Sequence, residues 1–269
     1  MKLYPENRTI LNKTQVIRFA GNLKRNTFCS TSPVFNGKLS TYPMNDSSQQ
    51  QVTVKQRALL VGATGLVGNL ILHQLIKDSA IEEVRVITRR SLPDQDKSEK
   101  VKEIVIDFDA LQDHPEWFNV DIVFCALGTT IAKARTPEAF RRVDYDYPLI
   151  VAKLALLQGA RHFLIVSAIG ANPRSRFFYN RIKGELEEAI LKLGYPSVTI
   201  ARPSMLLGDR REYRLGEHLA KKITWLFPSF LANVKASQVA AALVQAAHQH
   251  ETGVTIIDNK TLRVIKTEK

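Results

Sequence analysis

The chain of 269 residues has few cysteines and no long apolar run. Its two cysteines, Cys29 and Cys125, lie in dissimilar contexts with no spacing typical of metal ligands. A disulfide framework or a zinc site is therefore not expected, and a reducing, cytoplasmic compartment fits this cysteine usage. No apolar stretch approaches the roughly 18–20 residues that cross a bilayer, so we expect no membrane span.

Acidic side chains are fewer than basic ones. The sequence has 38 Lys and Arg against 26 Asp and Glu, a formal net charge of +12. Such an excess is typical of proteins with nucleic-acid or anionic-membrane partners. Residues 1–50 hold seven basic and two acidic side chains, and the remaining excess is scattered without a dense stripe or interleaved aromatics. We therefore expect no specific nucleic-acid binding, because charge alone raises only non-specific affinity.

Residues 1–55 differ in composition from the rest of the chain. They are rich in Ser, Thr, Asn, Gln and Lys and show no sustained period of 2 or 3.6. Three interpretations compete: an organelle transit peptide, a disordered tail, or upstream sequence before a true start at Met44. We favour a disordered or non-native extension, because no sustained amphipathic helix is visible. Residues 56–269 are then expected to form the folded domain.

Short β-branched runs alternate with longer helical patterns from Lys55 onward. Nearly continuous apolar strands separated by helices predict a parallel sheet covered on both faces, which is a doubly wound α/β fold. Thr136-Pro137 has the residues of a helix start, and Gly159 and Gly194 stand where helix C-caps belong. The predicted strands are 58–62, 84–88, 103–107, 121–126, 162–167 and 197–201, and the predicted helices include 66–77, 137–158 and 176–193.

The C-terminal part of the sequence predicts a lid and a closing helix. A segment at about 207–235 follows the sixth strand and is a plausible substrate lid. Its arginines are expected to pair with neighbouring acids, and its aromatics to join the core or a subunit interface; these are Arg210, Arg211, Arg214, Trp225, Phe227 and Phe230. Residues 237–250 predict a helix with His248 and His250 facing solvent. Residues 253–265 predict one or two terminal strands.

The stretch ALLVGATGLVG (58–68) places three glycines between a strand and a helix. Gly62 permits the tight turn, Gly65 lets the backbone approach a pyrophosphate, and Gly68 allows the helix to pack closely on the strand. The helix N-terminus supplies unpaired N–H groups for the anion. This context favours a dinucleotide loop over an ordinary turn. The candidate cofactor contacts here are Gly62, Thr64, Gly65, Leu66, Val67 and Gly68.

The end of the second predicted strand selects the cofactor. An NAD site usually places an acid there for the ribose 2′-hydroxyl, whereas arginine accommodates the 2′-phosphate of NADP. The stretch VRVITRRSLP (84–93) offers Arg89 and Arg90 and no acid. The sequence therefore favours NADP(H) over NAD(H).

Two later strand ends complete the candidate cofactor site. Asp107 and Asp109 end the third strand, where a carboxylate can accept from an adenine amino group, and Gly128 after the fourth strand allows close approach to the cofactor. These positions meet at the carboxyl edge of a parallel sheet, where such folds bind ligands. The candidate contacts are Asp107, Phe108, Leu127, Gly128 and Thr129.

Tyr179 and Lys183 are four residues apart on a predicted helix, so that they share a face. Ser167 ends the preceding strand, twelve residues before Tyr179. Tyrosine has a reference pKa of about 10, and a nearby ammonium stabilises the phenolate and lowers that pKa. We therefore predict that Ser167 polarises a carbonyl, that Tyr179 exchanges the proton, and that the nicotinamide carries hydride. Lys183 is a candidate for both the catalytic and the cofactor site.

Together the glycine loop, Ser167 and Tyr179-x-x-x-Lys183 resemble the short-chain dehydrogenase/reductase superfamily in its extended or atypical branch. The stretches CALGTTIAKA (125–134), FFYNRIKGELE (177–187) and ARPSMLLGDRREYRLGEHLAKK (201–222) resemble more narrowly its Tat-interacting-protein oxidoreductase group. The resemblance covers roughly residues 56–269. It implies a Rossmann fold, NADP(H) binding and oxidoreductase capability. It also implies that Tyr179 is the acid/base and that Arg202, Pro203 and Ser204 border the nicotinamide.

Three functions are consistent with these residues. The leading one is an NADPH-dependent reductase, or the reverse dehydrogenase, that acts on a small-molecule carbonyl compound. The second is a regulator that senses NADP(H) and acts through a protein partner. The third is an epimerase or dehydratase that keeps NAD tightly bound. The presence of Tyr179, Lys183 and Ser167 favours the enzyme over the sensor, and Arg89 and Arg90 argue against the epimerase. Whether the chain forms a homodimer stays open.

Overall fold

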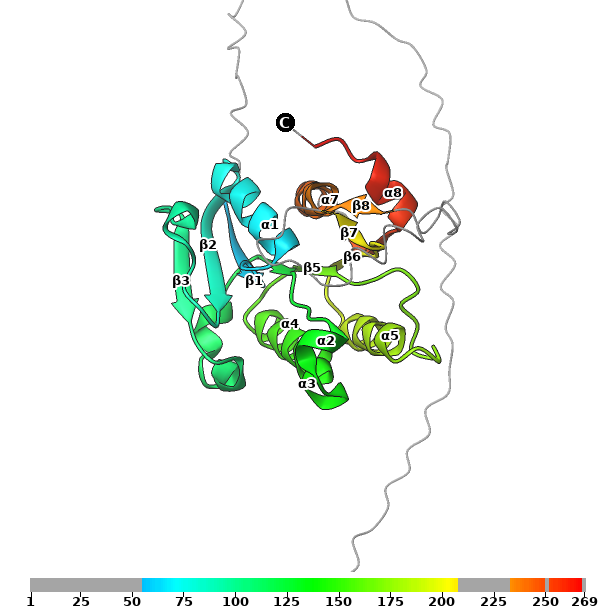
Figure 1. Ribbon diagram of the computed structural model, residues 1–269. Helices are drawn as coiled ribbons and strands as arrows, with labels where there is room; N and C mark the ends of the chain where they lie inside the picture. The colour runs from blue at the N-terminus through cyan, green and yellow to red at the C-terminus, as the bar shows by residue number, and fades with distance from the viewer. Residues whose placement is uncertain (1–54, 208–232, 250–251, 268–269) are drawn as a thin grey trace, which may run out of the picture. The chain divides into compact units, whose positions relative to one another are not determined.

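A seven-stranded parallel sheet forms the centre of the computed structural model, which describes residues 55–207, 233–249 and 252–267 (Figure 1). The strand order is β3-β2-β1-β4-β5-β6-β9, and every neighbouring pair is parallel. The order reverses between β1 and β4, so the ligand crevice of this architecture lies at the carboxyl ends of these strands. The predicted doubly wound α/β fold is confirmed.

The six predicted strands are all present, with ends that differ from the prediction by at most three residues. The strands are β1 (Gln56–Val61), β2 (Ile81–Thr88), β3 (Val101–Val105), β4 (Ile122–Cys125), β5 (His162–Val166), β6 (Ser197–Ala201), β7 (Leu206–Leu207), β8 (Val234–Lys235) and β9 (Gly253–Ile257). β7 and β8 form a separate two-stranded sheet.

Helices connect the strands. The α-helices are α1 (Leu66–Lys77), α2 (Ile131–Ala134), α3 (Pro137–Arg141), α4 (Tyr147–Leu157), α5 (Phe178–Leu191), α7 (Ala236–His248) and α8 (Asn259–Val264). Short 3₁₀ turns are η1 (Asp94–Asp96), η2 (Phe108–Asp113) and η3 (Pro115–Phe118), and η4 (Arg142–Asp146) is a π turn between α3 and α4.

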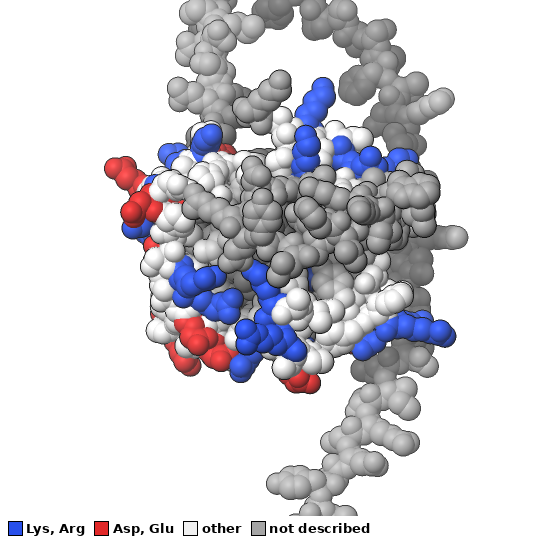
Figure 2. Space-filling model, in the orientation of Figure 1, with Lys and Arg blue, Asp and Glu red and all other residues white. Residues whose placement is uncertain are grey.

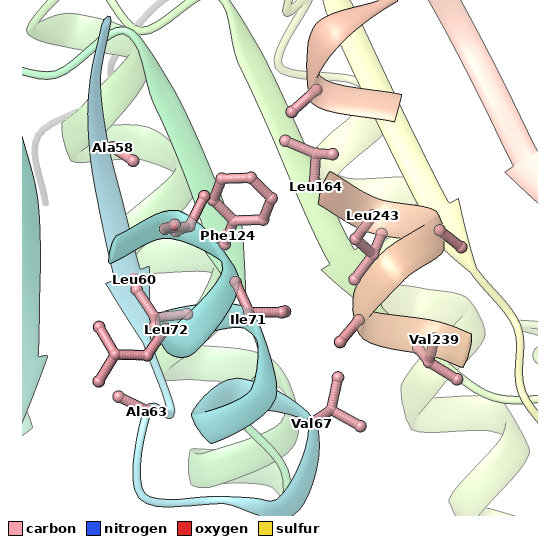
Figure 3. Close-up of a cluster of buried hydrophobic side chains, with 14 of the residues drawn as sticks. Ala58, Leu60, Ala63, Val67, Ile71, Leu72, Phe124, Leu164, Val239 and Leu243 are labelled. Atoms are coloured by element: carbon pink, nitrogen blue, oxygen red, sulfur yellow. The ribbon is translucent and has the colours of Figure 1, made fainter. Parts of the chain in front are cut away.

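Alternate residues of each central strand face opposite cores, as a sheet covered on both sides requires. In β1, Leu60 packs into the cluster that includes Ile71 of α1 and Leu243 of α7. Its neighbour Leu59 packs into the other cluster, which includes Val151 of α4. Figure 3 shows the first cluster, with the side chains of α1 and α7 directed at the strands between them. The sheet therefore presents only its strand ends to a ligand.

Two helix signals in the sequence are confirmed. The Thr136 hydroxyl accepts a hydrogen bond from the Ala139 N–H, and Pro137 is the first residue of α3. Gly159 has φ +97° just beyond the C-cap of α4, and Gly194 has φ +79° beyond α5. A positive φ of this kind is where glycine is favoured over other residues.

One expectation about elements is corrected, and two others gain detail. The predicted helix over 137–158 is present as α3, η4 and α4 in unbroken succession, with π geometry at Arg142–Asp146. The second possible terminal strand is wrong, because Asp258 caps the helix α8 by accepting from the Thr261 N–H. His248 is exposed, as predicted, and its Nε2 also lies 2.7 Å from the Asp78 carboxylate at the end of α1.

Some predicted features lie outside the described residues. They include the N-terminal extension 1–54 with Cys29 and Met44, His250, and residues 208–232 with the arginines and aromatics of the predicted lid. Within the described ranges, no helix has both the length and the apolar character that a membrane crossing needs.

Candidate active site

The glycine loop forms a tight turn between β1 and α1. Gly62 has φ +88°, and a Cβ at this position would lie 2.6 Å from the Ala126 carbonyl. A Cβ at Gly68 would lie 2.1 Å from the Gly62 oxygen, so the helix rests directly on the loop. Gly65 is the N-cap of α1, with no side-chain cap and no acid in the first turn. The first N–H groups of α1 therefore remain available for an anion.

The other loop residues divide between surface and core. Thr64 and Gly65 are exposed, whereas Val67 is buried in the cluster of Figure 3 and can offer only its backbone to a ligand. Leu66 is half-buried. The loop thus presents backbone and one hydroxyl to the crevice.

Arg89 and Arg90 lie beside the glycine loop, as the sequence predicts. A small hollow of about 50 Å³ separates them from the loop. Its lining contains no acid and consists of Gly62, Thr64, Ile87, Thr88, Arg89, Arg90, Phe108 and Leu127. The Thr88 hydroxyl donates to the Arg90 carbonyl at 2.9 Å and holds the turn that carries both arginines. A group bound here would meet two guanidinium ions and no carboxylate.

A wider open hollow of about 550 Å³ adjoins Arg89 on another side and is also lined by Arg142 and Tyr147. The Arg89 guanidinium lies 5.9 Å from the centre of the Phe108 ring. Asp109 accepts from the Tyr147 hydroxyl at 2.8 Å and pairs with Arg142 at 3.4 Å. Burial and the contact with Asp109 raise the pKa of Tyr147 to about 12. The carboxylate of Asp109 is thus already bound by the side chains of Tyr147 and Arg142.

Asp107 caps the short turn η2. Its carboxylate accepts from the Asp109 N–H at 3.1 Å. The following residue, Phe108, is buried and packs edge-on against Tyr147, with ring centres 5.4 Å apart. Phe108 lines the small hollow beside Arg89, whereas Asp107 follows β3 as the N-cap of η2 and does not line it.

Lys183 forms a buried ion pair. Its Nζ lies 2.8 Å from Asp144 Oδ1, and the two side chains are 4% and 1% exposed. Burial alone would lower the pKa of Lys183, but the charges of Asp144 and Tyr179 outweigh it and raise that pKa. Tyr179 is half-buried one turn earlier on α5, with its ring centre 5.7 Å from that of Phe140. The structure thus brings Tyr179 and Lys183 to one face and adds Asp144 to them.

The loop after β4 rests on this ion pair. Asp144 Oδ2 accepts from the Thr129 N–H at 2.8 Å. A Cβ at Gly128 would lie 3.4 Å from Asp144 Oδ1 and 3.8 Å from Lys183 Nζ. Gly128 is exposed and Leu127 half-buried. Of the predicted cofactor residues, Gly128 therefore lies over Lys183 and Thr129 contacts its partner Asp144.

Ser167 is held by a carboxylate from α5. Its hydroxyl donates to Glu187 in a short hydrogen bond. Glu187 is 4% exposed and also binds the Arg202 guanidinium, with 3.1 Å to Nε and 2.5 Å to Nη2. Because a hydroxyl has one proton, Ser167 directs it at Glu187 here and offers only lone pairs elsewhere. The predicted polarisation of a carbonyl by Ser167 requires this bond to be exchanged.

The residues after β6 use their polar groups within the fold. Pro203 accepts from the Ile169 N–H at 2.8 Å, and the Ser204 N–H donates to Asn259 at 2.8 Å. Arg202 is bound through its side chain to Glu187. These three residues lie at the same strand ends as Ser167, because the Ser167 N–H donates to the carbonyl of Ala201.

Asp144 and Glu187 are site residues that the sequence analysis missed. Glu187 lies four residues after Lys183, just as Lys183 lies four residues after Tyr179. The helical repeat therefore predicts that all three share one face of α5. Asp144 lies on the stripe of buried residues that includes Phe140 and Val151, where an acid needs a partner. Their partners come from distant parts of the chain, which spacing alone does not reveal.

Basic side chains on the face shown in Figure 2 form separate groups. Asp and Glu lie near some of these groups, and white surface lies between the central group and the one to its right. Among the described residues visible there, no continuous basic stripe runs across the face.

Comparison with known proteins identifies the family. The family model described as semialdehyde dehydrogenase, NAD binding domain, matches residues 57–149. Protein HTATIP2 of Rattus norvegicus is 36% identical over 176 residues, which are 65% of this chain and 72% of the relative. Mitochondrial protein FMP52 of Candida albicans is 34% identical over 209 residues, 72% of this chain and 89% of the relative. The chain belongs to the HTATIP2/FMP52 family.

This membership confirms the resemblance to the Tat-interacting-protein group. The chain therefore has an NAD(P)-binding Rossmann domain of the atypical short-chain dehydrogenase/reductase kind. The FMP52 protein of Candida glabrata is 35% identical over 209 residues, 72% of this chain and 86% of the relative, and is also named mitochondrial.

Solved structures show the same fold at low sequence identity. The ADP-L-glycero-D-manno-heptose-6-epimerase of Helicobacter pylori has a TM-score of 0.58 at 17% identity, covering 77% of each chain. The enzyme WbmG of Bordetella bronchiseptica in complex with NAD has a TM-score of 0.58 at 15% identity, covering 76% of this chain and 73% of WbmG. This similarity supports the Rossmann architecture.

Proposed function

We propose that the chain is an NADP(H)-dependent oxidoreductase that interconverts a small carbonyl compound and its alcohol. The observation that carries this proposal is the placement of Lys183, buried under Gly128 and next to Tyr179, at the carboxyl edge of the sheet that also holds the glycine loop. One edge thus combines an anion-binding helix N-terminus with a proton-transfer pair.

The preference for NADP(H) is supported by the hollow beside the glycine loop. Its lining includes Arg89 and Arg90 and no acid. A 2′-phosphate would form charge-assisted hydrogen bonds with these guanidinium groups. A ribose 2′-hydroxyl would find no carboxylate in this lining, which is the group that NAD sites usually provide. The open backbone of Gly65 and the uncapped N-terminus of α1 fit the pyrophosphate.

Tyr179 is the proposed acid/base of the reaction. It gives its proton to the carbonyl oxygen in reduction and takes it back in oxidation. Lys183 holds a positive charge beside the phenol, which favours the phenolate left after proton transfer. The bound nicotinamide supplies or accepts the hydride. Ser167 assists by donating to the substrate oxygen once its bond to Glu187 is exchanged, or by accepting from a substrate hydroxyl.

A carbonyl screen tests this proposal. The full-length chain is incubated with NADPH and a panel of aldehydes, ketones and quinones, and loss of NADPH absorbance is followed. We expect turnover with at least one class and product alcohol in equal amount to NADPH consumed. Tight NADPH binding without turnover across the panel would contradict the enzyme and favour the redox sensor. Release of tightly bound NAD on denaturation would instead favour the epimerase.

The compartment is a separate question. The cysteine usage favours a reducing compartment, for which we propose the cytoplasm. The fungal relatives carry mitochondrial in their names, and the Ser-rich, basic residues 1–55 have a composition found in transit peptides. Cell fractionation of the full-length chain decides between them: recovery of the protein in mitochondria, shortened at its N-terminus, would contradict the cytoplasmic proposal.

A further inference from the structure

We propose that Asp144 is a positioning residue that sets the pH at which the Tyr179–Lys183 pair gives up its proton. The proposal rests on the proposed function for the role of Tyr179, but the titration of the pair is a property of the protein alone. Its basis is a fully buried carboxylate that contacts Lys183 and the loop above it.

Both oxygens of Asp144 have fixed partners. Oδ1 lies 2.8 Å from Lys183 Nζ, and Oδ2 accepts from the Thr129 N–H at 2.8 Å. Asp144 is fully buried in the π turn η4, so both contacts are shielded from solvent. The ammonium lies below Gly128 and interacts with the charge of Tyr179.

The charges around Lys183 come from three elements. The π turn contributes Asp144, α5 contributes Tyr179, and β4 contributes the thiol of Cys125, whose pKa burial raises to about 12, so that it is neutral. Glu187 lies on the next turn of α5, but Arg202 already neutralises it. Asp144 is therefore the carboxylate in the described part of the chain that acts directly on the pair.

This arrangement opposes the loss of a proton. With Asp144 ionised, the ammonium of Lys183 already has one negative partner, so a phenolate at Tyr179 would be the second. Removal of the Asp144 charge leaves the buried Lys183 ammonium without this negative partner. Either Tyr179 then loses its proton to pair with the ammonium, or Lys183 itself loses a proton. In both cases the first proton leaves the pair at lower pH. Asp144 therefore delays the loss of the first proton from the pair to higher pH, which preserves the proton that is donated to a carbonyl.

The test follows both groups of the pair in the full-length chain. Tyrosinate absorbance, taken as the difference from Tyr179→Phe, reports Tyr179. The ¹³Cε shift of labelled lysine, assigned by its loss in Lys183→Met, reports Lys183. In Asp144→Asn we expect the earlier of the two titrations to fall by about one pH unit or more. Unchanged titrations in folded Asp144→Asn would overturn the proposal.

Two further variants make the result specific. Glu185 lies on the same helix as Lys183, and Glu185→Gln removes its ion pair with Arg141 without changing a contact of Lys183. The titrations of Tyr179 and Lys183 should both be unchanged in this variant. Should Asp144→Asn fail to fold, the comparison is made between Lys183→Met and Lys183→Met with Asp144→Asn, in which Tyr179 alone titrates. Tyr179 should then ionise about one pH unit lower in the double variant, and equal values would overturn the proposal.

The outcomes also separate this inference from the proposed function. A shifted titration together with no turnover on any carbonyl would retain the role of Asp144 and reject the oxidoreductase. Turnover with unshifted titrations would retain the oxidoreductase and reject the role of Asp144.

Discussion

At position 179, one phenol hydroxyl carries the proposed proton transfer. Tyr179→Phe keeps the ring against Phe140 and removes only the proton donor. We expect kcat to fall by about 100-fold or more, while the Kd for NADPH stays within about twofold, because the ring keeps its packing and only the hydroxyl is lost. Single-turnover kinetics and nicotinamide fluorescence measure the two quantities.

Tyr145→Phe is the matched control for this substitution. It also removes one phenol hydroxyl, from a ring whose described contact is with the Arg141 guanidinium at 4.1 Å. Its kcat should equal that of the parent chain. A Tyr179→Phe variant with parental kcat would remove Tyr179 from the mechanism.

The positions of single residues were predictable where local spacing determines them. Tyr179 and Lys183 are one helical turn apart, so the sequence alone predicts that they share a face. Asp144 and Glu187 were not predicted, because their roles depend on Lys183 and Arg202, which other elements bring to them. The sequence likewise predicts that Ser167 donates to a substrate, because spacing alone does not show that Glu187 accepts its proton.

At the scale of elements, α1 packs so closely on the glycine loop that a side chain at Gly68 has no space. A Cβ at Gly68 would lie 2.1 Å from the Gly62 oxygen. Gly68→Ala should therefore move α1 away from β1, lower the free energy of unfolding by about 2–3 kcal/mol and weaken NADPH binding. Urea denaturation measures the first effect and nicotinamide fluorescence the second.

Gly159→Ala is the control for the loss of a glycine. Gly159 has φ +97°, but a Cβ there would meet nothing within 4 Å. It should cost about 1 kcal/mol of stability from backbone strain and leave NADPH binding unchanged. A Gly68→Ala variant as stable as Gly159→Ala would contradict the close packing of α1 on the loop.

An ion-pair network joins β2 to β3. Glu83 lies 2.6 Å from Arg85 and 2.7 Å from Lys102. Burial alone would raise the pKa of Glu83, but the hydrogen bonds from Lys102 and Arg85 outweigh it and hold the pKa below its ordinary value. A lowered pKa in the folded state stabilises the protein above the unfolded pKa, and this contribution is lost as the pH falls through the folded value.

Glu83→Gln should therefore lower the free energy of unfolding by about 1 kcal/mol at pH 7. The difference from the parent chain should shrink as the pH falls from about 5 to about 3. Urea denaturation across this range measures it, with the exposed Glu99→Gln as control. A difference that is constant from pH 7 to 3 would show that the Glu83 charge does not contribute.

The elements themselves were largely predictable, and one error has a clear physical origin. The stretch VTIIDNKTLRVI is rich in β-branched residues, which favour strands, and β9 is indeed a strand. Asp258 nevertheless begins the helix α8 by accepting from the Thr261 N–H. An aspartate is a favoured N-cap residue, because its side chain accepts from a backbone N–H of the first helical turn. This signal is present in the sequence and outweighs the β-branched composition.

At the scale of the whole molecule, the sheet brings the site together. Alternation of strands and helices predicts a parallel sheet, and parallel strands place their carboxyl ends at one edge. The sequence could therefore assign the glycine loop, the arginine pair and Tyr179 to one edge before the strand order was known. The order β3-β2-β1-β4-β5-β6-β9 is a tertiary property. It places β4, and with it the loop over Lys183, next to β1.

The central claim is that this edge binds NADP(H) through the glycine loop and the two arginines. The most direct test titrates the full-length chain with NADPH and NADH separately and follows nicotinamide fluorescence, alongside the Arg89→Ala/Arg90→Ala double variant. The account predicts NADPH binding at least about tenfold tighter than NADH binding, and loss of that preference in the double variant with little change for NADH. Equal or tighter binding of NADH by the parent chain, or no binding of either cofactor by folded protein, would contradict it.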